Sequence, residues 1–218
     1  MAHMANVRSI GGQRPDLHWQ PTLLSAVADA PTFDASFTTA RRIALDDAAW
    51  VEHVAGWVDG AAALFEVVVA DAPWEHRTVR MYDRMVEEPR LTAWYGRTLG
   101  DGDVPAIFNA MVDALRRRYG RAFDGVGAAL YRDGHDSVAW HSDRVDPTLV
   151  EPLVAIVSLG SARTLRMRPK RKGATRPFPL LPGDLFVMGG ATQATWEHAV
   201  PKVASAGARV SLQFRHST

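Results

Sequence analysis

The sequence predicts a mainly β chain with helices on its N-terminal side, of sandwich or jelly-roll architecture. Two observations favour this class: helical spacing is confined to the first 120 residues, and short β-type runs separated by turn residues fill the rest. The runs lie at 125–131, 136–141, 153–159, 164–168, 184–188, 194–198 and 209–214. Many short strands without intervening helices are typical of sandwiches and jelly rolls.

Two stretches show the helical spacing. In residues 46–59, Trp50 and Trp57 recur on one helical face behind an acidic start, which the helix dipole favours. In residues 103–120, an apolar stripe ends at Gly120, a common helix stop. We therefore predict a helix over each range, with both tryptophans in the core.

The chain has 218 residues, enough for one domain with a sizeable core. Residues 1–40 show no sustained period and predict an N-terminal arm, whose residues 1–4 we interpret as a cloning scar. Residues 41–218 are then the folded domain, and we expect it to be a monomer.

Composition excludes several classes of site. Lys and Arg number 25 against 24 Asp and Glu, so the whole chain is nearly neutral. Any surface that binds a polyanion must therefore be a local cluster of basic residues. The absence of cysteine excludes thiolate metal sites, thiol nucleophiles and disulfides. The apolar runs are too short to cross a bilayer, so we expect no membrane partner and a cytoplasmic location.

Candidate metal ligands lie in the β region. His141 and Asp143 are two apart, so on a strand both side chains point to one face, and His198 follows in a later run. Taken alone, such a pair is more often a set of surface or hydrogen-bonded core residues. Two histidines and one carboxylate are, however, the ligand set of non-haem Fe(II) oxygenases.

The C-terminal run favours the metal interpretation. Strand alternation would aim Arg209, Ser211, Gln213 and Arg215 to one face. An arginine inside a barrel is costly unless it is paired, and a dicarboxylate matches its planar, bidentate geometry. The run therefore predicts a carboxylate-binding site close to the metal.

With these residues in place, the sequence resembles the AlkB-type dioxygenases over roughly residues 73–215. The resembling stretches are 89–96, 130–134, 136–143, 158–164, 190–194, 198–202 and 209–215. The resemblance implies a double-stranded β-helix (jelly-roll) dioxygenase fold with N-terminal helices, and a nucleotide-recognition lid at about 73–100.

The resemblance also implies the roles of single residues. The implied iron ligands are His141, Asp143 and His198. The residues implied to bind 2-oxoglutarate are Tyr131, Arg209, Ser211 and Arg215, and those implied to bind the substrate are Trp94, Tyr95, Arg90 and Arg163. We expect Trp94 or Tyr95 to stack on an extruded base.

The implied cofactors are Fe(II), 2-oxoglutarate and O2. The implied activity is oxidative dealkylation of bases such as 1-methyladenine and 3-methylcytosine in alkylated DNA or RNA, as in repair of DNA alkylation damage. 2-Oxoglutarate would be decarboxylated to succinate and CO2, and formaldehyde released. Two alternatives stay open, namely an Fe(II)/2-oxoglutarate hydroxylase of a protein or small molecule and a non-catalytic nucleic-acid-binding module.

Three positions depart from the family pattern. Ala129 and Ser211 stand where many members have asparagine, and Val145 stands where an acidic residue is common. The basic run 163–172 has two interpretations, a solvated hairpin or a phosphate contact beside the site. We assign Trp74 and Trp140 to the core or to support of the lid.

Overall fold

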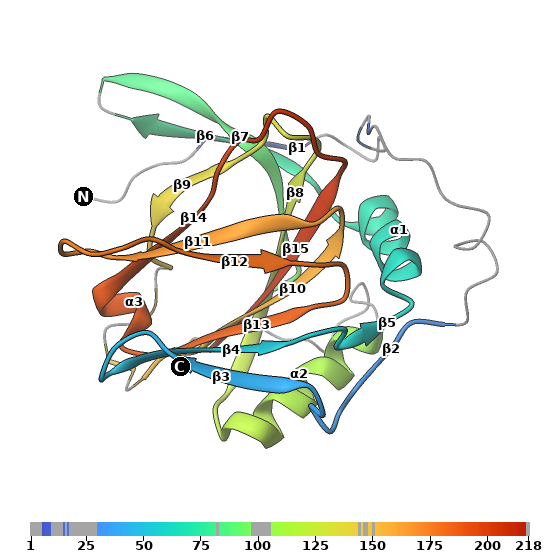
Figure 1. Ribbon diagram of the computed structural model, residues 1–218. Helices are drawn as coiled ribbons and strands as arrows, with labels where there is room; N and C mark the ends of the chain where they lie inside the picture. Colours follow the sequence, from blue (N-terminus) through green and yellow to red (C-terminus); the bar gives the residue numbers. More distant parts are fainter. Residues whose placement is uncertain are drawn as a thin grey trace.

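Two β-sheets face each other, and two helices cover the outer face of the larger sheet (Figure 1). The computed structural model describes residues 6–9, 15, 17, 30–81, 83–96, 106–143, 145, 148–149 and 151–216. None of the helices in this described part is long and apolar enough to span a bilayer.

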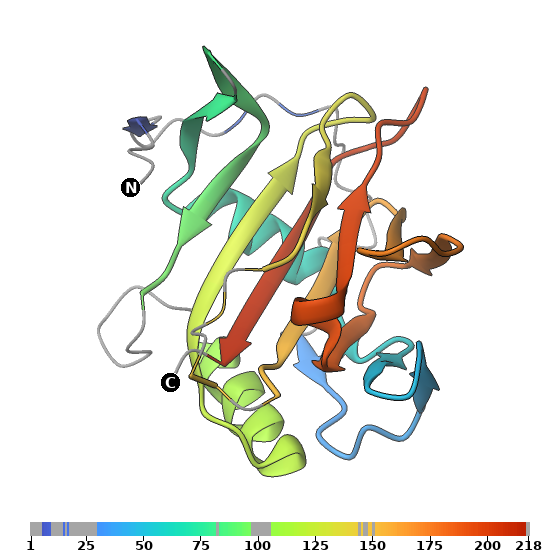
Figure 2. The same ribbon diagram turned by 90° about the vertical axis from the view of Figure 1, so that its left-hand side faces the viewer.

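The larger sheet has nine strands in the order β1-β6-β7-β8-β15-β10-β13-β4-β3. These are β1 (Asn6–Ser9), β6 (Glu75–Met81), β7 (Arg84–Trp94), β8 (Phe123–Tyr131), β15 (Arg209–His216), β10 (Val154–Gly160), β13 (Leu185–Gly190), β4 (Ala49–Val54) and β3 (Ala40–Ala44). All its neighbouring strands are antiparallel. Figure 2 shows strands β7, β8, β15 and β10 of this sheet side by side.

The smaller sheet has four strands in the order β12-β11-β14-β9. These are β12 (Arg176–Leu180), β11 (Arg163–Pro169), β14 (Trp196–Val200) and β9 (Val138–His141). A separate pair joins β2 (Thr32–Phe33) to β5 (Val58–Asp59). The helices are α1 (Ala61–Asp71), α2 (Ala106–Tyr119) and the single turn α3 (Thr192–Thr195).

Strand alternation divides the core into two layers. On β15, Val210, Leu212 and Phe214 join the outer cluster, which also holds the buried faces of α1 and α2. The intervening residues of β15 face the space between the two sheets. The larger sheet is thus buried on one side by helices and on the other by the smaller sheet.

The predicted helix over 46–59 is wrong, because most of that range forms β4 and β5. Strand β4 is buried on both faces: Val54 contributes to the outer cluster and Val51 to the inner one. A strand buried on both faces has no period of two, so the spacing of Trp50 and Trp57 imitates a helix. Trp57 is buried and Trp50 packs against the outer cluster, as expected of core residues.

The other predictions agree better with the structure. Helix α2 lies within the predicted range 103–120, whose first residues are outside those described, and each predicted β-type run overlaps a strand. Helix α1 and strands β3, β6, β7 and β12 were not predicted. The described part of residues 75–94, within the predicted lid, forms the hairpin β6–β7, which extends the larger sheet.

Only part of the predicted arm is described. Strand β1 pairs with β6, and Leu17 and Phe33 pack against the outer core cluster. The interpretation of residues 1–4 falls on residues outside those described.

Candidate active site

The three predicted metal ligands converge between the sheets. His141 ends β9, Asp143 follows it, and His198 lies opposite His141 on the neighbouring strand β14. One ligand atom from each residue lies within 4.8 Å of the other two, and His198 Nε2 is 3.5 Å from an Asp143 carboxylate oxygen. Ligands at right angles around a metal, bonded at about 2.1 Å, lie about 3 Å apart, so the three side chains converge on one point and a bound ion would draw their ligand atoms closer together.

The protonation states of His198 and Asp143 favour the binding of a cation. Burial lowers the pKa of His198 to about 4, so the imidazole is neutral at physiological pH and has a free lone pair. Burial alone would raise the pKa of Asp143, but His198 and Arg215 outweigh it and hold that pKa below its usual value. A neutral imidazole beside an ionised carboxylate is the state that a metal ion requires.

Neighbouring groups orient the ligands. His141 Nδ1 lies 2.9 Å from the Ala139 carbonyl oxygen, a contact in which Nδ1–H donates and Nε2 is left for a metal. The Asp143 amide donates to Gln193 Oε1 at 2.9 Å, and the Ser142 hydroxyl donates to the Trp196 carbonyl at 2.8 Å. The role of Gln193 was not predicted, because no spacing rule links it to Asp143.

A small cavity of ≈60 Å³ adjoins the three ligands. Arg209, Ser211, Gln213 and Arg215 all line it, as strand alternation predicts, together with Tyr131. Arg209 is only 1% exposed, and its Nη1 has no hydrogen-bond partner. The guanidinium is buried with no acidic partner among the described residues, so an anion at this point would remove an unfavourable charge.

Two further contacts hold Arg209 in place. Its Nε donates to the Ser158 hydroxyl at 3.0 Å, and its guanidinium carbon lies 5.3 Å from the centre of the Tyr131 ring. Ser158 and Ala129 flank Ser211 on the adjacent strands. The two departures from the family pattern, Ala129 and Ser211, are therefore side by side, and Ser211 lines the cavity.

Arg215 lies between this cavity and the outside. Its Nη2 donates to Asp143 Oδ1 at 3.0 Å and to Gln213 Oε1 at 3.1 Å. It also lines a larger, open cleft of ≈780 Å³, which reaches His141 and Asp143 from the solvent side. A molecule in this cleft would approach the three ligands past Arg215.

Trp94 and Arg90 line the cleft, at the end of the hairpin β6–β7. Trp94 is 47% exposed, and its indole lies over two glycines of β8. A Cβ at Gly125 would clash with the indole at 2.6 Å, and a Cβ at Gly127 would be in tight contact with it at 3.3 Å. Glycine at both positions therefore lets the ring lie flat on β8.

The prediction that Tyr95 faces the substrate is wrong. Its ring packs edge-on against Phe108 of α2 with ring centres 5.3 Å apart, and its hydroxyl is buried. Burial raises the pKa of Tyr95 far above its usual value. Adjacent residues of an extended chain point in opposite directions, so Trp94 and Tyr95 cannot both face the cleft.

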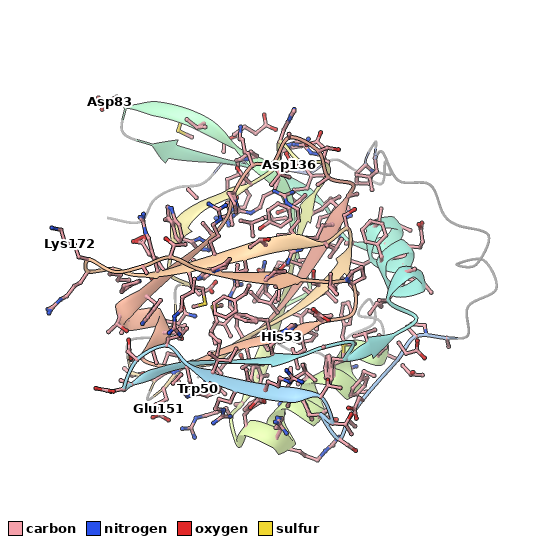
Figure 3. The ribbon with its side chains drawn as sticks, viewed as in Figure 1. Trp50, His53, Asp83, Asp136, Glu151 and Lys172 are labelled. Carbon is pink, nitrogen blue, oxygen red and sulfur yellow. The ribbon has the colours of Figure 1, made fainter. Side chains whose placement is uncertain are left out.

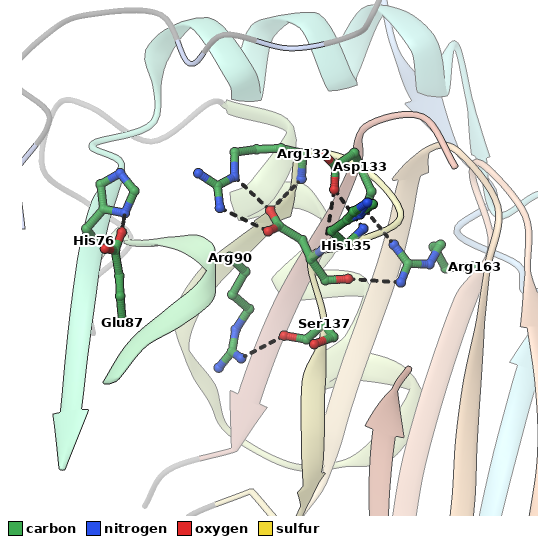
Figure 4. A network of polar contacts seen from close by, with 9 residues as sticks. His76, Glu87, Arg90, Arg132, Asp133, His135, Ser137 and Arg163 are labelled. Carbon is green, nitrogen blue, oxygen red and sulfur yellow. Dashed lines mark hydrogen bonds and ion pairs between the residues drawn. The ribbon is translucent and has the colours of Figure 1, made fainter. Parts of the chain in front are cut away.

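The substrate-binding role predicted for Arg163 is also wrong. The side chain is 4% exposed, and it donates to the carbonyl oxygens of Asp133, Asp136 and Pro201 at 3.0, 3.0 and 2.6 Å. Figure 4 shows this guanidinium beside the turn that precedes β9. Arg163 points inward because it lies two residues before the buried Leu165, on the same face of β11.

The rest of the basic run divides between several positions. Arg166 lines the cleft, Arg168 pairs with Glu197 at 3.3 Å, and Lys170 donates to the Gln193 carbonyl of α3 at 3.0 Å. Lys172 lies at the tip of the hairpin β11–β12, which projects from the body (Figure 3). Neither the solvated hairpin nor the phosphate contact therefore describes the run as a whole.

Trp74 is buried, as expected of a core residue, but Trp140 is not. The indole of Trp140 is part of the cleft wall beside His141. Val145 packs against the inner core cluster.

Comparison with known proteins identifies the family of this site. The model of the 2OG-Fe(II) oxygenase superfamily matches residues 58–215, which includes all the ligands and the Arg209 strand. The chain belongs to this superfamily. Its membership confirms the predicted jelly-roll fold and the predicted use of Fe(II), 2-oxoglutarate and O2.

Several curated proteins are similar to this oxygenase. The human "Alpha-ketoglutarate-dependent dioxygenase alkB homolog 3" is 35% identical over 73% of this chain and 63% of its own length. The Arabidopsis thaliana "DNA oxidative demethylase ALKBH2" is 28% identical over 69% of this chain and 60% of its own length. An uncharacterized protein of Acanthamoeba polyphaga mimivirus is 30% identical over 65% and 80%.

These similarities confirm the predicted resemblance to AlkB-type dioxygenases. The chain spans less than two thirds of the length of the human and Arabidopsis relatives that it matches.

The residues of this oxygenase fit its cofactors. His141, Asp143 and His198 would hold Fe(II), because their donor set leaves coordination positions open. The unpartnered Nη1 of Arg209 fits the distal carboxylate of 2-oxoglutarate, since a guanidinium binds a carboxylate by two parallel hydrogen bonds.

Proposed function

We propose that this oxygenase removes alkyl groups from N-alkylated nucleic-acid bases, in DNA or RNA. The observation that carries the proposal is the cleft, where the exposed Trp94 lies on the route to His141 and Asp143. The names of the human and Arabidopsis relatives support it, since one is an AlkB homologue and the other a DNA oxidative demethylase.

A flat base suits this cleft. Stacking of a base on an aromatic ring contributes about 1 to 3 kcal/mol and tolerates any base. The glycines beneath Trp94 fix the height of the ring, and a Cβ at Gly127 would be 3.6 Å from Arg215 Nη1. A base on Trp94 would therefore lie beside Arg215, which contacts Asp143.

The residues of the chain have separate tasks in this reaction. Fe(II), with 2-oxoglutarate and O2, supplies the oxidising power that hydroxylates the N-alkyl carbon. Arg209 and Tyr131 orient the cosubstrate, while Arg215 keeps Asp143 ionised and in place. Once hydroxylated, the N-alkyl group breaks its C–N bond and leaves as formaldehyde, the ring nitrogen recovers its lone pair, and the hydroxyl proton is released.

Cations around the cleft suit a polyanionic substrate. Arg77, Arg166 and Lys202 line it and form no ion pair with another described residue. Glu88 also lines it, but its charge is offset by Arg90 at 3.2 Å. The monomeric state and the cytoplasmic location remain predictions.

The test uses oligonucleotides that contain one 1-methyladenine or one 3-methylcytosine. We expect the protein, with Fe(II), 2-oxoglutarate and ascorbate, to remove the methyl group, as followed by mass spectrometry. Asp143→Ala is the matched control and should leave the oligonucleotide unchanged. Succinate formation without methyl loss from either oligonucleotide would instead favour a hydroxylase of a protein or small molecule.

A further inference from the structure

We propose that Trp140 binds the nucleotide adjacent to the target base, with Arg166 and Lys202 contacting its phosphates. This inference rests on the proposed function and extends it from one base to a short nucleic-acid strand that lies across β9. The sequence alone assigned Trp140 to the core or to the lid.

Trp140 lies on the cleft side of β9, beside a β-bulge. Strands β9 and β14 pair at His141 with His198 and at Val138 with Val200, so three steps on β9 match two on β14. The extra residue lets both Val138 and His141 face the inner cavity. Trp140 is adjacent to His141, so by strand alternation it points away from the inner cavity, and it lines the open cleft.

Arg168 supports the indole of Trp140. Its guanidinium carbon lies 4.2 Å from the centre of the indole ring, and its charge is offset by Glu197 at 3.3 Å. Arg168 therefore covers one face of the indole, while Trp140 lines the cleft. A cation held against an aromatic ring fixes its orientation, which lowers the entropic cost of stacking a base on it.

Two aromatic rings thus serve one cleft. Trp94 belongs to the wall formed by β7, and Trp140 belongs to β9 beside His141. A nucleic-acid strand whose target base stacks on Trp94 would cross β9, which would bring its next nucleotide near Trp140. Nucleic-acid sites without sequence preference typically combine aromatic platforms with a cationic groove.

The cations that line the cleft together with Trp140 are available for phosphates. Arg166 on β11 and Lys202 after β14 are both exposed and both line the cleft. Neither has an ion pair with any residue that the structure describes. The acidic groups of the cleft, Glu88 and Asp143, are matched by arginines, so its unpaired charge is positive.

The experiment measures steady-state kinetics on a pentanucleotide with 1-methyladenine at its centre. We expect Trp140→Ala to raise KM about tenfold with less than a twofold change in kcat, because the variant loses the surface on which the adjacent base stacks. Trp140→Phe should restore most of the affinity, since it keeps an aromatic face. Arg117→Gln, an exposed residue of α2 remote from the cleft lining, is the control.

The phosphate contacts are tested by salt dependence. The double variant Arg166→Gln, Lys202→Gln should reduce the slope of log affinity against log salt by roughly one unit for each phosphate that is no longer neutralised. Trp140→Ala should leave that slope nearly unchanged, because stacking releases no counterions.

Because Trp140 precedes a metal ligand, Co(II) affinity is measured in each variant. A KM for Trp140→Ala equal to that of the wild type overturns the subsite, and so does a fall in kcat that tracks weaker Co(II) binding. Wild-type protein that never removes the methyl group contradicts the proposed function itself, and the subsite is rejected with it.

Discussion

Arg209 carries a charge that no carboxylate among the described residues neutralises. Its Nε is satisfied by Ser158, but its Nη1 is buried and unpartnered. A buried cation in this state is unfavourable until an anion arrives. The affinity for 2-oxoglutarate should therefore depend on the shape of the Arg209 side chain as well as on its charge.

We predict that Arg209→Lys weakens 2-oxoglutarate binding by roughly tenfold to a hundredfold. An ammonium keeps the charge but loses the bidentate geometry, and a charge-assisted hydrogen bond contributes about 1.5 to 3 kcal/mol. Calorimetric titration with Co(II) in place of Fe(II) measures this directly. Arg121→Lys, on the surface, is the control, and equal affinities for Arg209→Lys and wild type would rule out this role.

At this scale the sequence predicted what strand alternation determines. His141, Asp143, Arg209 and Arg215 lie together because residues two apart share a face. The contacts of Arg163 join segments far apart in the chain, which no local pattern encodes. Alternation along 163–169 does, however, predict that Arg163 points inward with Leu165.

Between elements, Arg163 joins the two strands that carry the histidine ligands. Its guanidinium donates to the Asp133 and Asp136 carbonyls before β9 (Figure 4). It also donates to the Pro201 carbonyl after β14. In the same turn, the Asp136 carboxylate accepts a hydrogen bond from the Arg132 amide at 2.8 Å and two from the Arg132 side chain at 2.8 and 2.9 Å. The relative position of His141 and His198 should therefore depend on Arg163.

We predict that Arg163→Met lowers the free energy of unfolding by at least about 2 kcal/mol, because buried carbonyls lose their donors. It should also weaken Co(II) binding by about tenfold, as changes in groups that orient ligands do. Arg163→Lys should rescue neither effect fully, since one ammonium cannot reach all three carbonyl oxygens to which the guanidinium donates. Lower stability with unchanged Co(II) affinity would show that the contact does not position the ligands.

A second contact between elements connects β4 to α2. Glu52 is 3% exposed, and it accepts hydrogen bonds from Tyr119 at 2.6 Å and Arg118 at 2.8 Å and pairs with Arg42 at 3.1 Å. Burial alone would raise the pKa of Glu52, but these donors outweigh it and lower the pKa. A carboxylate with a lowered pKa stabilises the fold above its unfolded pKa and loses this effect as the pH falls through its folded pKa.

We predict that Glu52→Gln lowers the free energy of unfolding by about 2 kcal/mol near neutral pH, since Arg42 is half exposed and adds little. The difference from wild type should be constant above about pH 4.3 and shrink as the pH falls below it. Urea denaturation at several pH values measures this difference. A difference that does not vary with pH would mean that the charge of Glu52 is not the cause.

Elements without a distinct polar face were the least predictable from the sequence. The spacing in β4 imitates a helix, and α1 shows no helical stripe because its residues are apolar on nearly every face. The pairing of β1 with β6 and of β9 with β14 depends on residues that are more than about 50 positions apart, farther than any local period reaches.

For the whole molecule, the net charge of +1 means that any attraction to a polyanion is local. We predict that replacing Arg171 and Lys172 with glutamine flattens the salt dependence of oligonucleotide binding by about one unit for each phosphate that these residues neutralise. Lys170 should matter less, because it is bound to the Gln193 carbonyl. An unchanged slope would identify the hairpin tip as a solvated turn.

The jelly roll, the helices and the cleft together account for one coupled reaction, so the most direct test is its stoichiometry. Repaired base, formaldehyde and succinate are quantified in one mixture with a methylated oligonucleotide in limiting amount. We expect the amount of formaldehyde to equal that of repaired base, and the amount of succinate to match both after the succinate formed without oligonucleotide is subtracted. Repaired base that forms without 2-oxoglutarate, or succinate that never rises with the oligonucleotide, would contradict it.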